Sequence, residues 1–249
     1  MKRLILLLIF CCAAVSAAAA LQDTAGALFG QANDAYIKGR YRQAASLYLQ
    51  VAHKAGVSAE LLGNLADSYA AAGQTGEAVL NYERALRLAP SNAVLRADLQ
   101  QLRKETGLFQ KQTWPERLAG LLGADQWLLL SGAAFVLLSL TMLTVGVLGR
   151  KRFPQAGRLN FLFFIITLAS LPPALFRYQS WQDGVVISSN AELLISPFAE
   201  AEPVSKLKEG GIVRPLDKEH GQYVLVRAAS GQQGWLEKSS FQQIAALPL

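Results

Sequence analysis

Apolar and polar positions follow different patterns in successive parts of the chain. After an apolar N-terminus, residues 24–107 place small and apolar residues at the spacing of amphipathic helices. Two uncharged apolar stretches follow at 127–149 and 159–176. From residue 182 onward, short β-rich runs alternate with glycine-containing turns. The pattern predicts a multi-domain membrane protein with an all-α part, a two-helix transmembrane hairpin and a C-terminal all-β barrel.

The N-terminus has the pattern of a secretory signal peptide. Lys2 and Arg3 precede the apolar run Leu4–Val15, and small residues with an Ala-x-Ala cleavage site follow. We expect residues 1–20 to be removed. The alternative is an uncleaved anchor helix, but the twelve residues of Leu4–Val15 fall short of the roughly 20 that a span needs.

The helical part repeats itself at a shift of 34 residues. Gly39 corresponds to Gly73 and Tyr48 to Tyr82, with small residues at equivalent places that let two helices approach closely. A period of 34 residues resembles the tetratricopeptide repeat. The expected domain covers 24–107, with repeats at about 25–58 and 59–92 and a capping helix at 92–105.

This array is short. The second copy lies close to the family pattern, whereas the first departs from it at Gln31 and Val51. Pro90 ends the second copy, and Ser91 or Asn92 can cap the following helix. Because stable stacks usually need about three repeats, we expect the domain to lean on a partner or on the membrane.

The resemblance to tetratricopeptide repeats implies a concave partner-binding face built from the first helix of each repeat. Its candidate residues here are Phe29, Asn33, Tyr36, Ile37, Glu60, Asn64 and Asp67. A clamp for a C-terminal carboxylate is not expected, since Phe29 occupies the basic position and Asp67 replaces an asparagine. The alternative role for Phe29 and Tyr36 is ordinary packing within the repeat.

A short helix is expected just before the first apolar stretch. The sequence Thr113-Trp114-Pro115-Glu116 has the spacing of a capping box. The helix at 113–126 either lies along the bilayer surface, with Trp114 and Trp127 in the aromatic belt, or is a plain linker.

The link between the two apolar stretches predicts the topology. Residues 150–158 carry four positive charges and no negative one, and short basic loops stay in the cytoplasm. Both folded parts should then lie in the periplasm, anchored by two spans in a bacterial inner membrane. The spans at 127–149 and 159–176 contain no ionisable residue, which argues against a proton or ion path. Pro172 and Pro173 are expected to bend the end of the second span.

Composition adds two constraints. Cys11 and Cys12, the only cysteines, lie in the signal, so the mature chain has no thiol for a disulfide or a metal. The net charge of +6 arises from Lys2, Arg3 and the 150–158 link, because the remaining basic and acidic residues balance. No nucleic-acid partner is expected from such a chain.

The β-rich part resembles bacterial SH3 domains, SH3b. The resemblance rests on the turn at 207–210, on Tyr223–Arg227 and above all on the Gly231–Leu236 segment, which also contains Gly234 and Trp235. It implies a barrel over 182–249 that recognises peptide or peptidoglycan through an aromatic groove. Tyr223 and Trp235 are the groove candidates, and the alternative for both is the barrel core.

Catalytic patterns are missing from the sequence. His53 and His220 lie in different parts of the chain, and no metal-ligand spacing, nucleophile elbow or phosphate-binding loop accompanies them. We expect a protein that is not an enzyme and that holds no metal or cofactor.

Taken together, the order of signal, repeats, hairpin and β module resembles the BatE-type proteins of the Bacteroides aerotolerance operon. The ending Gly234–Ile244 is also similar to that group. The resemblance implies an envelope complex with von Willebrand factor A-domain Bat proteins and a MoxR-type ATPase. The expected function is a membrane-anchored periplasmic scaffold that binds protein partners. The alternative is an envelope sensor or anchor that binds peptidoglycan through the SH3b part.

Overall fold

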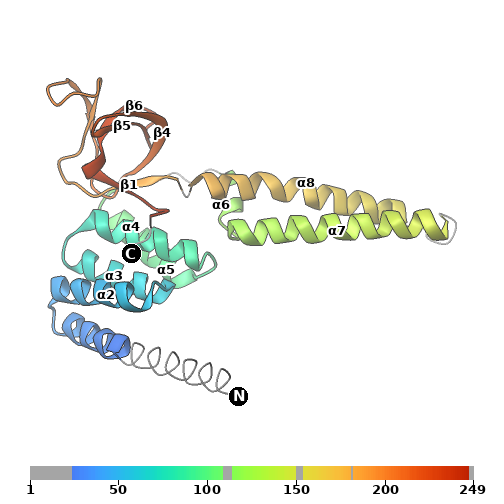
Figure 1. The fold of residues 1–249 in the computed structure, drawn as a ribbon, viewed down its shortest axis with the longest axis horizontal. Helices are drawn as coiled ribbons and strands as arrows, with labels where there is room; N and C mark the ends of the chain where they lie inside the picture. The colour runs from blue at the N-terminus through green and yellow to red at the C-terminus, as the bar shows by residue number, and fades with distance from the viewer. Residues whose placement is uncertain (1–23, 109–113, 150–153, 181, 247–249) are drawn as a thin grey trace, which may run out of the picture. The chain divides into compact units, whose positions relative to one another are not determined.

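The computed structural model describes residues 24–108, 114–149, 154–180 and 182–246 (Figure 1). The signal peptide, Thr113 and most of the basic link lie outside these residues. The described chain forms two compact units. One unit contains the helical repeats together with the β-rich part, and the other contains the apolar hairpin.

The helical part of the first unit begins with a helix over residues 24–37. Four further helices follow it: α2 Tyr41–Ala55, α3 Ala59–Ala71, α4 Thr75–Leu88 and α5 Ala93–Glu105. Gly39 and Gly73 have φ angles of 70° and 77°, a region in which glycine has no steric penalty. Each ends the turn after the first helix of a pair, and Ser58 caps α3 by accepting a hydrogen bond from the Leu61 amide at 3.1 Å.

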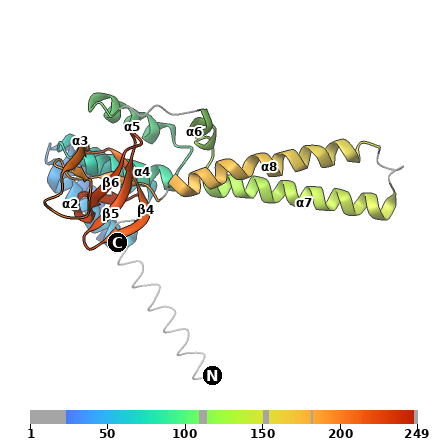
Figure 2. The same cartoon turned by 90° about the horizontal axis from the view of Figure 1, so that it is seen from above.

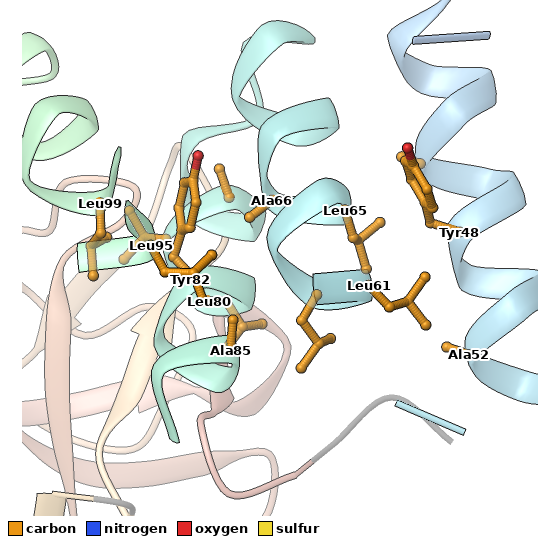
Figure 3. Close-up of a cluster of buried hydrophobic side chains, with 14 of the residues drawn as sticks. Tyr48, Ala52, Leu61, Leu65, Ala66, Leu80, Tyr82, Ala85, Leu95 and Leu99 are labelled. Atoms are coloured by element: carbon orange, nitrogen blue, oxygen red, sulfur yellow. The ribbon is translucent and has the colours of Figure 1, made fainter. Parts of the chain in front are cut away.

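Small residues at repeat-equivalent positions bring the helices together. Ala32 and Ala66 in the first helices, and Ala44 and Ala78 in the second, are fully buried. Large side chains fill the remaining volume between the helices; among them are Leu62, Leu65 and Leu80, each 0% exposed. Figure 3 shows Leu61 and Leu65 on the side of α3 that faces Tyr48 of α2. The predicted helical repeat is therefore confirmed as a set of helix pairs with one continuous core.

The β-rich part is an antiparallel sheet of seven strands. The strands are β1 Gly184–Val186, β2 Glu192–Leu194, β3 Pro203–Lys206, β4 Ile212–His220, β5 Tyr223–Ala228, β6 Gln233–Glu237 and β7 Phe241–Gln243. Their order in the sheet is β3-β2-β6-β5-β4-β1-β7. Val213, Val226 and Leu236 belong to a buried cluster on one side of the sheet.

The expectation of a closed barrel is corrected by this order. The strands β3 and β7 are the two edges and do not pair with each other, so the sheet is not closed. At the β7 end, arginines of α4 donate hydrogen bonds to the backbone. The Arg84 guanidinium donates to the Gln243 carbonyl at 3.3 Å, and that of Arg87 donates to the Ala245 carbonyl at 3.0 Å. The helical part thus contacts the chain at and just after the edge strand β7.

The sheet and the helices share one hydrophobic core. Val185 of β1 and Ile244, just after β7, are buried in the same cluster as Leu80 of α4. Figure 1 shows β1 next to α4. The Glu209 carboxylate accepts a hydrogen bond from the Gly76 amide at 2.8 Å, in the first turn of α4. The short repeat array is therefore packed against the C-terminal sheet of the same chain.

The second unit is built on two long antiparallel helices that lie side by side (Figures 1 and 2). These are α7 Ala124–Leu148 and α8 Ala156–Ser180, preceded by the short helix α6 Trp114–Ala119. The helix α8 continues through Pro172 and Pro173 to Ser180, beyond the predicted end at 176. Both long helices have the length and apolar composition needed to cross a bilayer.

Polar side chains in this unit are paired within it. The Ser131 hydroxyl donates to the Thr167 carbonyl at 3.3 Å, and Thr141 is hydrogen-bonded to Asn160 across the hairpin. Large apolar side chains instead face outward; examples are Leu129, Leu143, Phe161 and Leu168. Large apolar side chains thus dominate the exposed surface of the two helices, and polar side chains join them across the hairpin.

The shared core predicts the effect of substitutions in two glycine turns. Gly210 and Gly231 have φ angles of 81° and 89°, so alanine at either costs about 1–2 kcal/mol of backbone strain. At Gly210 a Cβ would also lie 2.6 Å from Leu108 Cδ1 and 3.2 Å from Val79 Cγ2, whereas at Gly231 it meets nothing within 4 Å. We expect Gly210→Ala to lower the free energy of unfolding by about 1–3 kcal/mol more than Gly231→Ala.

Urea denaturation of the detergent-solubilised chain, followed by circular dichroism, measures both losses. Gly231→Ala is the matched control for the backbone strain alone. Equal losses in the two variants would contradict a close contact between the 207–210 turn and the helices.

Candidate functional site

The same hydrogen bond occurs in both repeats and defines one face of the helical part. In the first repeat the Tyr48 hydroxyl of α2 donates to Asn33 Oδ1 at 2.5 Å. In the second repeat the Tyr82 hydroxyl of α4 donates to the carboxylate of Asp67 on α3. Figure 3 shows the two hydroxyl groups pointing to the same side of the helical layer. Each phenol thus orients a polar side chain of the first helix on this face.

Aromatic rings border the first of these bonds. The Phe29 ring meets that of Tyr48 edge-on, with 5.6 Å between centroids, and the rings of Tyr36 and Tyr41 are 5.3 Å apart. Phe29 and Tyr36 are half-buried. Both rings pack within the repeat, which is the alternative role that the sequence allowed for them. Each ring is also partly exposed and can contact a partner.

Asp67 is the electrostatic centre of the face. Burial raises the pKa of its carboxyl, the hydrogen bond from Tyr82 lowers it, and the negative charge of Asp98 on α5 raises it. Burial and the charge of Asp67 also raise the pKa of the Tyr36 hydroxyl. The first helix, α3, α4 and α5 therefore all contribute to one acidic and tyrosine-rich region.

The remaining predicted residues extend this region along the first helices. Ile37 is 81% exposed at the end of the first helix, and Glu60 is exposed at the start of α3. Asn64 is half-buried on α3, one turn before Asp67. We name the set Phe29, Asn33, Tyr36, Ile37, Glu60, Asn64, Asp67 and Asp98 the acidic face.

Three residues of this region were missed at the level of sequence. Tyr48 and Tyr82 lie outside the predicted set, although each lies fifteen positions after the polar residue that it binds. Asp98 lies in the helix that the sequence predicts as a cap at 92–105. Its signal was the repeat period, since it follows Asn64 by 34 positions.

Strand register places Tyr223 and Trp235 on the side of the sheet opposite the buried cluster. Val224 pairs with Leu236, and both belong to that cluster. Trp235 is the neighbour of Leu236, and side chains alternate between faces along a strand, so the indole lies on the other face. The register sets Tyr223 on this face too, at a position that is 8% exposed.

Trp235 lies in an apolar row that crosses three strands. It is paired with Leu225 on β5 and with Leu194 on β2. Trp235 and Leu225 are half-buried, whereas Leu194 is 9% exposed. This row is a second candidate surface, and it lies outside the core of the sheet.

The turn at 207–210, part of the SH3b resemblance, is used inside the molecule. Glu209 caps α4, and this places its charge close to Glu77 in the first turn of the same helix. Burial and Glu209 raise the pKa of the Glu77 carboxyl, while Arg84 lowers it. Burial lowers the pKa of the Arg84 guanidinium to about 10. These groups hold the sheet against the helices.

Chemistry-bearing residues are dispersed elsewhere in the described chain. Among the residues that the structure describes, no group of three His, Cys, Asp or Glu side chains lies close enough together to hold a metal ion. His53 is exposed on α2, and His220 makes an edge contact with the Phe198 ring at 5.8 Å.

Comparison with known proteins identifies one part of this architecture. Residues 59–92, which include α3 and α4, match the tetratricopeptide repeat family. No curated protein matches the chain. The helical part is therefore of the tetratricopeptide type, a class of repeat that serves in protein–protein interaction.

The hydrogen bond to Asp67 predicts the stability of an asparagine variant. Asp67→Asn keeps an acceptor for Tyr82, as Asn33 does for Tyr48, and removes a partly buried charge. Because the pKa of Asp67 is raised by folding, the folded wild type gains stability as the pH falls through that raised pKa. We expect the variant to be at least as stable as the wild type at neutral pH, with the difference shrinking in mild acid.

Thermal unfolding between pH 5 and pH 8 measures this difference. The reverse substitution, Asn33→Asp, is the matched control, because it adds a carboxylate to the equivalent hydrogen bond from Tyr48 and should destabilise the chain at neutral pH. A loss of stability in Asp67→Asn at neutral pH would contradict the conclusion that burial of the Asp67 charge is unfavourable in the folded chain.

Proposed function

We propose that this protein is a membrane-anchored scaffold that binds partner proteins through the acidic face. The match of 59–92 to the tetratricopeptide repeat carries the proposal, because these repeats present the first helix of each pair to partners. The orientation of Asn33 and Asp67 by two equivalent tyrosines supports it, since a preorganised face loses less entropy on binding. The protein is not an enzyme in this proposal.

The anchor is formed by α7 and α8 as a two-span hairpin in a bacterial inner membrane. Its support is the length and composition of the two helices and the basic link at 150–158. Both folded parts then lie in the periplasm. By resemblance to BatE-type proteins, the partners proposed are von Willebrand factor A-domain Bat proteins and a MoxR-type ATPase system.

Reporter fusions test the topology. A reporter that is active only outside the cytoplasm should be active when fused after Leu249 and silent when fused at Gln155. The four positive charges of the link oppose its translocation and give this outcome. The opposite pattern of activity would overturn the periplasmic assignment.

Site-specific photo-crosslinking tests the binding face. A photoreactive residue at Ile37, which is 81% exposed, should form adducts with partner proteins in intact cells. The same residue at His53, exposed on the second helix of the first repeat, is the matched control and should form far fewer adducts. Equal adduct formation at both positions, or none at Ile37 at native expression, would count against the proposal.

A second candidate function is an envelope sensor or anchor that binds peptidoglycan through the sheet. The specific observation in its favour is the place of Trp235, in a half-buried apolar row opposite the core. Aromatic side chains on such surfaces stack on ligands with little loss of conformational freedom.

Sedimentation with purified cell-wall sacculi distinguishes the two functions. The full chain is required, because the sheet shares its core with the helices. Under the sensor hypothesis Trp235→Ala abolishes sedimentation and Asp67→Asn leaves it unchanged. Absence of sedimentation by the folded wild type would leave the scaffold as the better account.

A further inference from the structure

The acidic face continues onto α5, as the 34-residue period shows. Asp98 follows Asn64 by one period. Gly63 of α3 lies against α5, since a Cβ there would be 2.7 Å from Leu95 Cδ2, and Asp67 and Asp98 each follow this contact by about one helical turn. The positions that the same period assigns to this face include four acidic residues and one basic residue. The acids are Glu60, Asp67, Asp98 and Glu105, and the base is Lys104. The negative charge of the face therefore lies on two helices, α3 and α5, and the first helix adds uncharged residues to it.

The two central carboxylates have no counterion within the described chain. Neither Asp67 nor Asp98 forms an ion pair with a described lysine or arginine. The Arg103 guanidinium of α5 is engaged with Glu83 of α4 at 2.6 Å. Two neighbouring like charges without a cation create a negative potential that a bound cation would relieve.

Aromatic and apolar groups lie beside these carboxylates. Tyr36, whose hydroxyl feels the charge of Asp67, packs edge-on against Tyr41. Ile37 is 81% exposed on the next position of the same helix. Ring faces attract lysine and arginine head groups, and apolar surface accepts their methylene stems.

We propose that the acidic face binds a lysine- or arginine-bearing segment of a partner protein. The inference rests on the proposed function and specifies the chemistry of the partner. Charge complementarity carries it, with Asp67 and Asp98 as the central charge partners and Tyr36 as the adjoining ring. An acidic segment would be repelled, and a free C-terminal carboxylate would find no basic clamp at Phe29.

Three labelled peptides of equal length test the charge class. They share one neutral sequence in which every third or fourth residue is lysine, glutamine or glutamate. Binding to the full chain in non-ionic detergent is measured by fluorescence anisotropy. We expect the lysine peptide alone to bind, with an affinity that falls as salt is added. In the double variant Asp67→Asn/Asp98→Asn we expect a loss of about tenfold or more.

A matched variant separates local from overall charge. Glu200→Gln/Glu202→Gln removes the same number of charges from exposed positions between β2 and β3 and should leave the affinity unchanged. Thermal unfolding checks that both double variants are folded, which the retained acceptor for Tyr82 favours. Equal weakening by the two variants, or equally tight binding of the glutamine peptide, would overturn the proposal.

Failure of this inference can be told from failure of the scaffold function. If Ile37 still forms partner adducts while lysine-peptide binding does not depend on Asp67 and Asp98, the scaffold stands and the charge class is wrong. If adducts and peptide binding are both absent, both proposals are overturned.

Discussion

The packing of the C-terminal sheet against α4 is the contact on which the first unit depends. Two helix pairs and one further helix bury too little surface to form a durable stack alone, because each repeat relies on a neighbour to cover its apolar side. Val185 and Ile244 supply that cover for Leu80. The capping of α4 by Glu209 and the donors of Arg84 and Arg87 fix the sheet in place.

This contact separates two kinds of surface. The helices use α4 and its arginines to hold the sheet, while the acidic face is formed by the first helix, α3 and α5, with the phenols of Tyr48 and Tyr82 directed to it. On the sheet, the 207–210 turn is part of the contact with α4, whereas the apolar row that contains Trp235 takes no part in it. A partner can therefore reach the acidic face without opening the shared core.

A buried guanidinium at such a contact has a physical cost that its hydrogen bonds offset. Arg84 is 4% exposed, and burial lowers its pKa to about 10, so it stays charged at neutral pH. Its donors reach Gln242 and the Gln243 carbonyl at the edge of the sheet, and Glu77 on the same helix gives it a compensating charge. The edge strand β7 thus supplies acceptors to two of the donors of this buried charge.

The sequence alone determined the elements whose signals are local. The 34-residue period fixed the repeats, with Gly39 and Gly73 at the ends of their first helices, and uninterrupted apolar runs fixed α7 and α8. It also supplied most of the acidic face, because residues on one side of a helix recur at regular spacing. These features depend on periodicities that neighbouring residues enforce.

Only the tertiary structure decided which distant segments meet. Nothing in the spacing of Arg84 and Gln243, or of Gly76 and Glu209, indicates that they are bonded, since each pair is separated by more than a hundred residues. The pattern of the β-rich part predicted strands and turns, but closure of a sheet depends on what lies at its edges. Here α4 lies at the β7 edge. Contacts between residues so far apart in the sequence depend on the burial of the whole core.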